Sequence, residues 1–333
     1  MKHALFVLIV GLFLLVGCGE ADSMLPTAVS DSDGKLSLPS VAPAALNGRL
    51  LNVVATTSLI GDVVAQVGGD AIRLTTLMAP GQDPHSYQAT ARALTAVADA
   101  DIIFVNGWDL EEGLIANLQS AATAPLIPVS ANLTPLPLGD TAPDPADDHE
   151  KGTADPHVWL DPANVGQWVS NIQVVLSQLD PANESVFAAN ATTYTQALTR
   201  LQQEIVAQIG TIPADNRKLV TNHDALAYFA AAYDFTIIGT VIPGGSTLAE
   251  PSARGLAELA SLMRTEQVCT IFAEVTASDQ LAQGLAAELD YCATVDIVAL
   301  HTGALGPPDS GAESYLMMMQ LNGTRIADAL GNR

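Results

Sequence analysis

Basic side chains are scarce in this sequence. Its 333 residues carry 13 Lys and Arg against 36 Asp and Glu, which gives a formal net charge of −23. A charge of this sign repels phosphate backbones and argues against a nucleic-acid partner. It leaves two interpretations open, an acidic surface that concentrates cations near the protein or simple solubility in an export compartment.

The apolar run 4–16 is shorter than the roughly 20 residues that a membrane-spanning helix needs. Lys2 precedes the run and Leu15-Val16-Gly17-Cys18 ends it, which is typical of a secretion signal. These four residues also resemble a bacterial lipoprotein processing box. We therefore predict a signal peptide over 1–18 and lipidation of Cys18; a plain signal peptide cut nearby is the alternative.

Residues 19–50 repeat Ser, Pro, Ala and Asp without a sustained apolar period, and we predict a flexible tether there. A lipid anchor on a tether would hold an exported protein at the outer face of the cytoplasmic membrane, or in the periplasm. With Cys18 assigned to the lipid, only Cys269 and Cys292 remain. Disulfides persist outside the cytoplasm, so we expect these two to pair, with buried free thiols as the alternative. A zinc-thiolate site is disfavoured because neither lies near a histidine in sequence.

Length and a 49% hydrophobic content suggest two globular domains, and no tandem repeat indicates a solenoid. Strand-like and helix-like segments alternate in the first domain, 51–164. Expected strands are 52–57, 73–78, 101–105 and 125–129, and expected helices are 60–67, 90–98 and 110–120. This alternation predicts a parallel α/β sheet, which binds ligands at the carboxyl ends of its strands.

The segment 134–153 is rich in proline and acidic residues, and we predict that it is a solvated loop. His149 within it is either an ordinary surface residue or part of a weak site that collects metal. Helical periodicity then covers 165–179 and 182–209, with a break at Asp180-Pro181. We predict that 165–212 is a helical connector and that its long helix, about 182–210, extends roughly 40 Å and holds two lobes at a nearly fixed angle.

The second domain, 213–333, repeats the α/β pattern. Expected strands are 218–221, 236–242, 269–275 and 294–300, and expected helices are 225–233, 253–264, 279–290 and 312–330. The predicted fold class is therefore α/β, with two lobes that each contain a mostly parallel sheet and flanking helices. One long helix joins the lobes, and a ligand cleft lies between them.

Two motifs share the pattern Asp-Pro-His followed two residues later by an aromatic residue. They are Asp83-Pro84-His85-Ser86-Tyr87 and Asp155-Pro156-His157-Val158-Trp159. In each motif, the proline fixes the conformation of a turn, and a histidine follows it directly. His223 follows the expected strand 218–221. One histidine after a proline is more often a hydrogen-bonded loop residue, but three at such turns suggest one metal site built from distant parts of the chain. Asp83 and Asp155 either orient a ring nitrogen of the next histidine or simply form the turn.

Ordered motifs across 51–333 make the chain similar to a known family. They are Pro-Gly-Gln-Asp-Pro-His-Ser-Tyr (80–87), 98–107, Asp-Pro-His-Val-Trp-Leu-Asp-Pro (155–162), 221–230, 250–253, 271–274, and Ser314-Tyr315 with 317–319. The sequence resembles the cluster-A substrate-binding lipoproteins of ABC transporters that import zinc or manganese into bacteria, the zinc-uptake type in particular. The resemblance implies two α/β lobes on one long rigid helix, with a metal ion buried between them and handed to a membrane permease.

The resemblance also implies a ligand set. The first three ligand positions of the family match His85, His157 and His223, and three imidazoles suit zinc better than manganese, which prefers oxygen. The fourth is often an Asp or Glu, but here the aligned run 300–305 has Gly303 at that place. We expect water to complete the site, with Glu274 as the next candidate, followed by Asp224 and His301.

These observations predict a monomeric, extracytoplasmic protein that binds Zn²⁺ tightly and delivers it to an ABC permease. A manganese-preferring member of the same family is the alternative. A zinc-dependent hydrolase is a second one, because three histidines and water also make several catalytic zinc sites. No His-Glu-x-x-His or Gly-x-Ser-x-Gly motif is present, and no general base is placed beside the metal by a motif, which argues against an enzyme.

Overall fold

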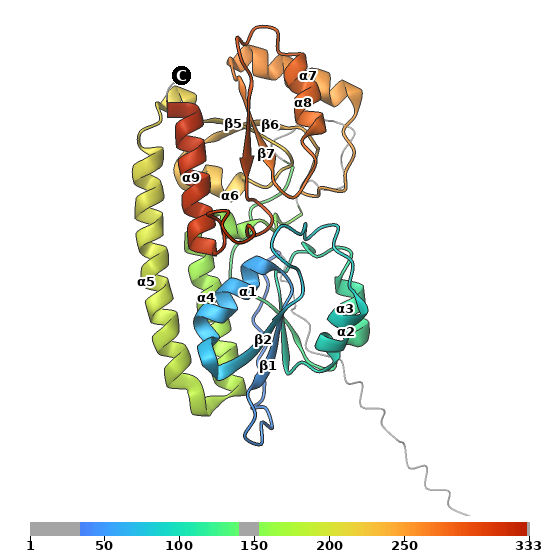
Figure 1. The fold of residues 1–333 in the computed structure, drawn as a ribbon, viewed down its shortest axis with the longest axis vertical. Coiled ribbons are helices and arrows are strands. Elements are labelled where there is room, and N and C mark those ends of the chain that lie inside the picture. Colours follow the sequence, from blue (N-terminus) through green and yellow to red (C-terminus); the bar gives the residue numbers. More distant parts are fainter. Residues whose placement is uncertain (1–33, 140–152, 332–333) are drawn as a thin grey trace, which may run out of the picture.

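The computed structural model describes residues 34–139 and 153–331. The expected signal peptide, Cys18 and His149 lie outside these ranges. Among the described residues, no helix has both the length and the apolar character to cross a membrane. Two α/β lobes lie one above the other, and long helices run beside both of them (Figure 1).

The N-terminal lobe contains a sheet of four parallel strands in the order β2-β1-β3-β4. The strands are β1 (Leu51–Ala55), β2 (Ile72–Thr76), β3 (Ile102–Val105) and β4 (Leu126–Pro128). The helices of this lobe are α1 (Ser58–Gly68), α2 (Ala91–Ala98) and α3 (Ile115–Ala121). Every residue of β3 is buried, as expected for a central parallel strand with both faces covered.

The C-terminal lobe repeats this arrangement with four parallel strands in the order β6-β5-β7-β8. The strands are β5 (Lys218–Thr221), β6 (Thr236–Thr240), β7 (Thr270–Glu274) and β8 (Asp296–Leu300). The helices are α6 (Ala227–Tyr233), α7 (Ala253–Glu266), α8 (Gln280–Ala287) and α9 (Tyr315–Gly331). The predicted fold class is confirmed.

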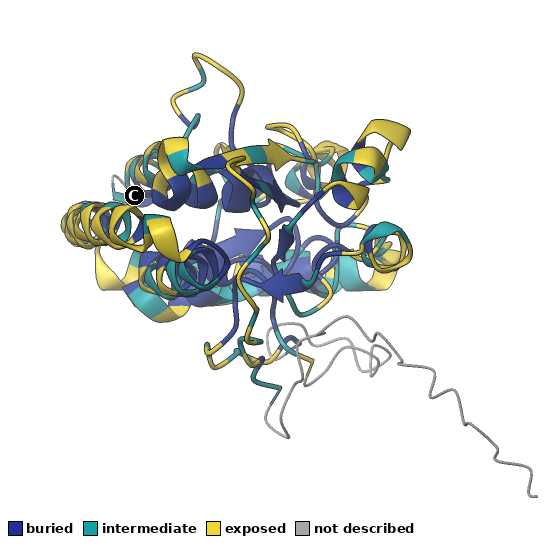
Figure 2. Cartoon of the chain, turned by 90° about the horizontal axis from the view of Figure 1, so that it is seen from below, coloured by how far each residue is buried: buried dark blue, intermediate teal, exposed yellow. Residues whose placement is uncertain are grey.

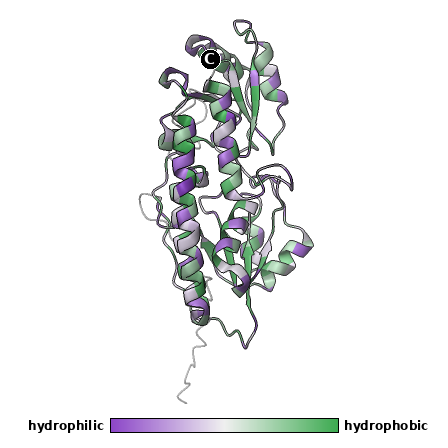
Figure 3. Ribbon diagram, turned by 60° about the vertical axis from the view of Figure 1, so that its left-hand side comes forward, coloured by the Kyte–Doolittle hydropathy of each residue, from purple (hydrophilic) through white to green (hydrophobic). Residues whose placement is uncertain are grey.

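Two helices connect the lobes, α4 (Pro162–Leu179) and α5 (Glu184–Ile209). Asp161 begins α4 by accepting a hydrogen bond from the backbone of Ala163, and Pro162 fits the first helical position. The 26 residues of α5 extend about 39 Å, and α5 packs against α1, α4 and α9. Its buried side chains share one face, whereas its outer face is exposed and mostly hydrophilic (Figures 2 and 3).

One apolar core continues through both lobes. It runs from Leu51 of β1 through Trp168 of α4 and Leu198 of α5 to Phe229 of α6 and Tyr315 of α9. The junction between the lobes is therefore packed rather than hinged on a bare linker, because separating the lobes there would expose buried apolar surface.

Two local expectations differ from the structure. Helix α3 begins at Ile115, not at 110, and residues 108–114 form turns in which Trp108 and Asp109 adopt positive φ angles of 51° and 54°. Residues 34–50 belong to the predicted tether, yet they lie against the N-terminal lobe. The Leu36 side chain is buried, and the backbone of Ala44 donates to the carbonyl of Leu179.

The expected pairing of Cys269 with Cys292 is present as a disulfide, with a Cα–Cα distance of 5.9 Å. Cys269 precedes β7 and Cys292 lies in the loop before β8, and these strands are neighbours in the sheet. The bond therefore closes a segment of the C-terminal lobe that contains β7 and α8.

Replacing both cysteines with alanine should lower the free energy of unfolding by about 3 kcal/mol, because the unfolded chain loses a cross-link across 23 residues. Urea unfolding of the oxidised protein, the reduced protein and the double variant measures this change. Reduction should destabilise the unmodified protein and leave the double variant unaffected. Equal stability of all three samples would contradict the prediction.

Candidate metal centre

His85 enters the centre on the loop that follows β2. The carboxylate of Asp83 accepts hydrogen bonds from the His85 backbone at 3.0 Å and from the Ser86 hydroxyl at 2.8 Å, and so shapes the turn. It also accepts a hydrogen bond from Thr247 of the other lobe at 2.7 Å. The carboxylate beside the ring of His85 is instead Glu112, whose Oε1 lies 3.1 Å from Nδ1. Asp83 therefore forms the turn and links the lobes, and the expected orienting role falls to Glu112.

His157 lies just before a short 3₁₀ turn, Val158–Leu160, that leads into α4. Oδ1 of Asp155 accepts from the His157 backbone at 2.9 Å and lies 2.8 Å from its Nδ1. Here the expected contact between an aspartate and the following histidine ring is present. Trp159 packs on the His157 ring at a centroid distance of 5.4 Å and donates its indole N–H to the carbonyl of Thr302 in the other lobe.

His223 follows β5, and Glu274 ends the neighbouring strand β7. Because the strands are parallel, their carboxyl ends meet at one edge of the sheet and place the two side chains together. Oε2 of Glu274 lies 3.1 Å from Nδ1 of His223. A Cβ at Gly303 would lie 2.5 Å from Oε1 of Glu274, so the glycine leaves the space that this carboxylate fills.

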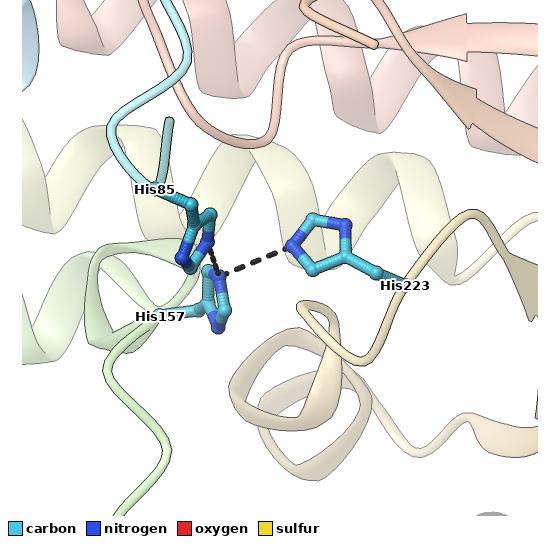
Figure 4. Close-up of side chains that lie close together, drawn as sticks. All are labelled: His85, His157 and His223. Carbon is cyan, nitrogen blue, oxygen red and sulfur yellow. Dashed lines mark hydrogen bonds between the residues drawn. The ribbon is translucent and has the colours of Figure 1, made fainter. Parts of the chain in front are cut away.

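The three histidine rings converge on one point (Figure 4). Nε2 of His157 lies 3.2 Å from Nε2 of both His85 and His223, and the exposed fractions of the three residues are 1%, 3% and 2%. Nitrogens bound to one tetrahedral Zn²⁺ at ~2.05 Å are about 3.3 Å apart, so the spacing fits a single ion. The carboxylate at each Nδ1 favours the tautomer with Nδ1–H, which leaves the lone pair of Nε2 for a metal.

The charges of the centre favour a cation. Burial lowers the pKa of His157 well below its ordinary value, and the neighbouring histidines add to this effect. Burial also opposes a charge on His223, but the contact with Glu274 outweighs it and raises the pKa of His223 overall. Burial alone would raise the pKa of Glu274, whereas His223 holds it at about 2. Burial raises the pKa of Asp155 to about 7. A metal ion would therefore displace a proton from His223 and favour ionised Asp155.

The expected candidates for a fourth ligand do not join this cluster. Within the described ranges, the group of potential ligand atoms that lie within 4.8 Å of one another contains only the three histidines. Glu274 stands behind His223, on the side of Nδ1. The backbone of Asp224 donates to Gly244, and the backbone of His301 is held by the amide of Asn322. The chemistry that remains is three imidazoles, and a tetrahedral ion bound to them would take one further ligand.

Two adjacent acidic residues that sequence reasoning missed lie beside the centre. Glu111 is fully buried, and its Oε1 accepts hydrogen bonds from Thr56 at 2.6 Å and from the backbone of Asn106 at 2.8 Å. It fixes the loop that carries Glu112. Both acids follow the buried strand β3, whose carboxyl end lies at the same edge of the N-terminal sheet as the loop of His85. This position in the sequence could have indicated them.

A family model described as zinc-uptake complex component A, periplasmic, matches residues 53–329. The chain belongs to this family. The manganese-binding lipoprotein MntA of Halalkalibacterium halodurans is 29% identical over 318 residues, which cover 95% of this chain and 94% of that protein. The manganese ABC transporter substrate-binding lipoprotein PsaA of Streptococcus mitis is 28% identical over 334 residues, which cover 98% of this chain and 97% of that protein.

A solved structure, the periplasmic zinc binding protein TroA from Treponema pallidum, is similar with a TM-score of 0.74 and 28% identity, and the match covers 84% of this chain and 99% of that one. The family member described here is thus an extracytoplasmic, metal-binding substrate-binding protein of an ABC transporter. It is not an enzyme, and the alternative of a three-histidine hydrolase is discarded. The names of these relatives divide between manganese and zinc, so they leave the metal open.

Asp155→Asn should weaken metal binding about 10-fold to 100-fold, because the amide keeps the shape of the side chain but removes the charge that supports the His157 ring. Competition with a chromophoric chelator measures the affinity. Asp83→Asn is the matched control and should cause a smaller loss, since Asp83 bonds to backbone and hydroxyl groups instead of a ring. Equal losses in the two variants would contradict the assignment.

Proposed function

We propose that this protein captures Zn²⁺ outside the cytoplasm and delivers it to the permease of its ABC transporter. The observation that supports zinc is the convergence of three imidazole nitrogens with no carboxylate oxygen of the described residues among them. Zn²⁺ binds imidazole readily in tetrahedral sites, whereas Mn²⁺ favours oxygen ligands. A water molecule occupies the fourth position in this proposal.

The centre uses both lobes, because His85 and His157 come from the N-terminal side and His223 comes from the C-terminal lobe. Interlobe hydrogen bonds from Thr247 to Asp83 and from Trp159 to Thr302 surround it. A displacement of one lobe by an ångström or two would therefore break the ligand shell. We propose that docking to the permease supplies this displacement, and that the protein acts as a monomer anchored through lipidated Cys18.

Manganese is a second candidate, and the names of the relatives support it. MntA and PsaA are both named for manganese and match almost the whole chain. Binding of Mn²⁺ would require oxygen ligands beyond the three imidazoles, from water and from a movement of Glu274 toward the ion. The donor atoms favour zinc and the relatives favour manganese, so a direct comparison of the two metals is the decisive experiment.

Calorimetric titration of metal-free protein should show one tight Zn²⁺ site per chain and much weaker Mn²⁺ binding. His157→Ala should abolish the tight site, because the ring of His157 lies between the other two. A variant at a distant surface position, Glu266→Gln, should bind as the unmodified protein does. Tighter binding of Mn²⁺ would overturn the zinc assignment and leave the manganese alternative, and binding of neither metal would overturn both.

Zinc affinity should decrease as the pH falls. The pKa of His223 lies above the ordinary 6.5, so this ring takes up a proton as the pH falls through that raised value. Zinc must then displace the proton, and the affinity should drop about tenfold for each further pH unit. The proton on His157 does not compete until the solution is more acidic, because its pKa is lowered. Affinity measured by competition that stays constant from pH 8 to pH 5 would contradict this site.

A further inference from the structure

Next to the metal centre, a cavity of about 360 Å³ opens between the lobes. Its wall includes His85, Trp108, Asp109 and Glu112 from the N-terminal lobe and Ser246 from the C-terminal lobe. Of the three converging histidines, only His85 lines this cavity. A cation that enters the cavity would therefore reach the centre past the His85 ring.

The carboxylates behind the three rings differ in their access to solvent. The side chains of Asp155 and Glu274 are exposed by 0% and 2%, whereas the side chain of Glu112 is exposed by 40%. Two of the rings are therefore fixed by groups that water and ions do not reach. The third ring, His85, is held by a carboxylate that faces the cavity.

Glu112 also contacts both sides of the cavity. Its Oε1 lies 3.1 Å from Nδ1 of His85, and Ser246 of the other lobe provides a second hydrogen bond. The side chain of Glu112 is partly exposed, and a carboxyl group in contact with water is ionised at neutral pH. Among the described residues that line the cavity, Asp109 is a further acid and none is lysine or arginine.

The loop that carries Glu112 is firmly placed. Residues 107–109 have consecutive positive φ angles of 99°, 51° and 54°, and the indole of Trp108 donates to the carbonyl of Gly34 at 2.7 Å. The buried Glu111 anchors the same loop through Thr56 and Asn106. The backbone around Glu112 is therefore fixed, and its side chain faces the cavity.

We propose that Glu112 is a positioning residue that controls access to the centre: it attracts the cation into the cavity and holds the His85 ring, which moves to admit the ion. This inference rests on the proposed metal binding and adds a kinetic role for one residue. Its charge acts on association through the negative potential of the cavity. Its hydrogen bond acts on dissociation, because a released His85 ring leaves the ion more readily.

Stopped-flow mixing of metal-free protein with Zn²⁺ tests the first role. In Glu112→Gln the association rate constant should fall roughly threefold to tenfold at low ionic strength, and the difference should shrink at high salt, because salt screens the lost charge. Glu258→Gln is the matched control, since the side chain of Glu258 is exposed by 38% and lines a different cavity. It should associate at the rate of the unmodified protein.

Release of Zn²⁺ to excess chelator tests the second role. Glu112→Ala removes the hydrogen bond as well as the charge and should release the ion several-fold faster than Glu112→Gln. The visible spectrum of the Co²⁺ form should stay unchanged in both variants, because Glu112 is not a ligand. A changed spectrum, or rates in both variants equal to those of Glu258→Gln, would overturn the proposal. If the unmodified protein binds no metal tightly, the proposed function itself fails.

Discussion

Each of the three converging imidazoles has a carboxylate on the side away from the centre, and the rest of the site depends on this pairing. Burying a polar ring is unfavourable unless its N–H has a partner, and the carboxylates supply that partner. They also place negative charge around the point on which the rings converge. A divalent cation that binds there loses its hydration, and this negative charge compensates for the loss. Without a metal, the pairs adjust their charge by protonation: Asp155 has a pKa of about 7, and His223 retains its proton more strongly than an ordinary histidine.

The fold brings these pairs together from distant parts of the chain. His85 follows a strand of one sheet, His223 follows a strand of the other, and His157 lies where the chain enters the connecting helices. Both sheets are parallel, so their carboxyl ends face the junction of the lobes. The carboxylates use the same geometry, because Glu274 ends β7 and Glu112 lies beyond β3.

Much of this could be predicted from the sequence, and the failures have physical causes. Alternating strands and helices predicted both sheets, and apolar spacing predicted α5 to within two residues of its start. The three histidines stood out because prolines fix their turns. Glu112 did not stand out, since its contact with a ring 27 positions away leaves no local pattern, and its position after the buried strand β3 was the signal available. The segment 34–50 was predicted as a tether because it lacks periodicity, yet a few contacts, such as that of Leu36, suffice to place an irregular segment on a surface.

The continuous core of the two lobes has a consequence for the energy of transport. In some binding proteins the lobes close on the ligand. Part of the binding free energy then drives that closure, and the apparent affinity is lower. Here the lobes share buried side chains from β1 to α9, so the arrangement that binds the ion is already the stable one. Binding of the ion then requires no closure of the lobes, and release becomes the uphill step. The work of that step must come from the transporter, which makes the ATP cycle on the far side of the membrane the source of free energy for emptying this site.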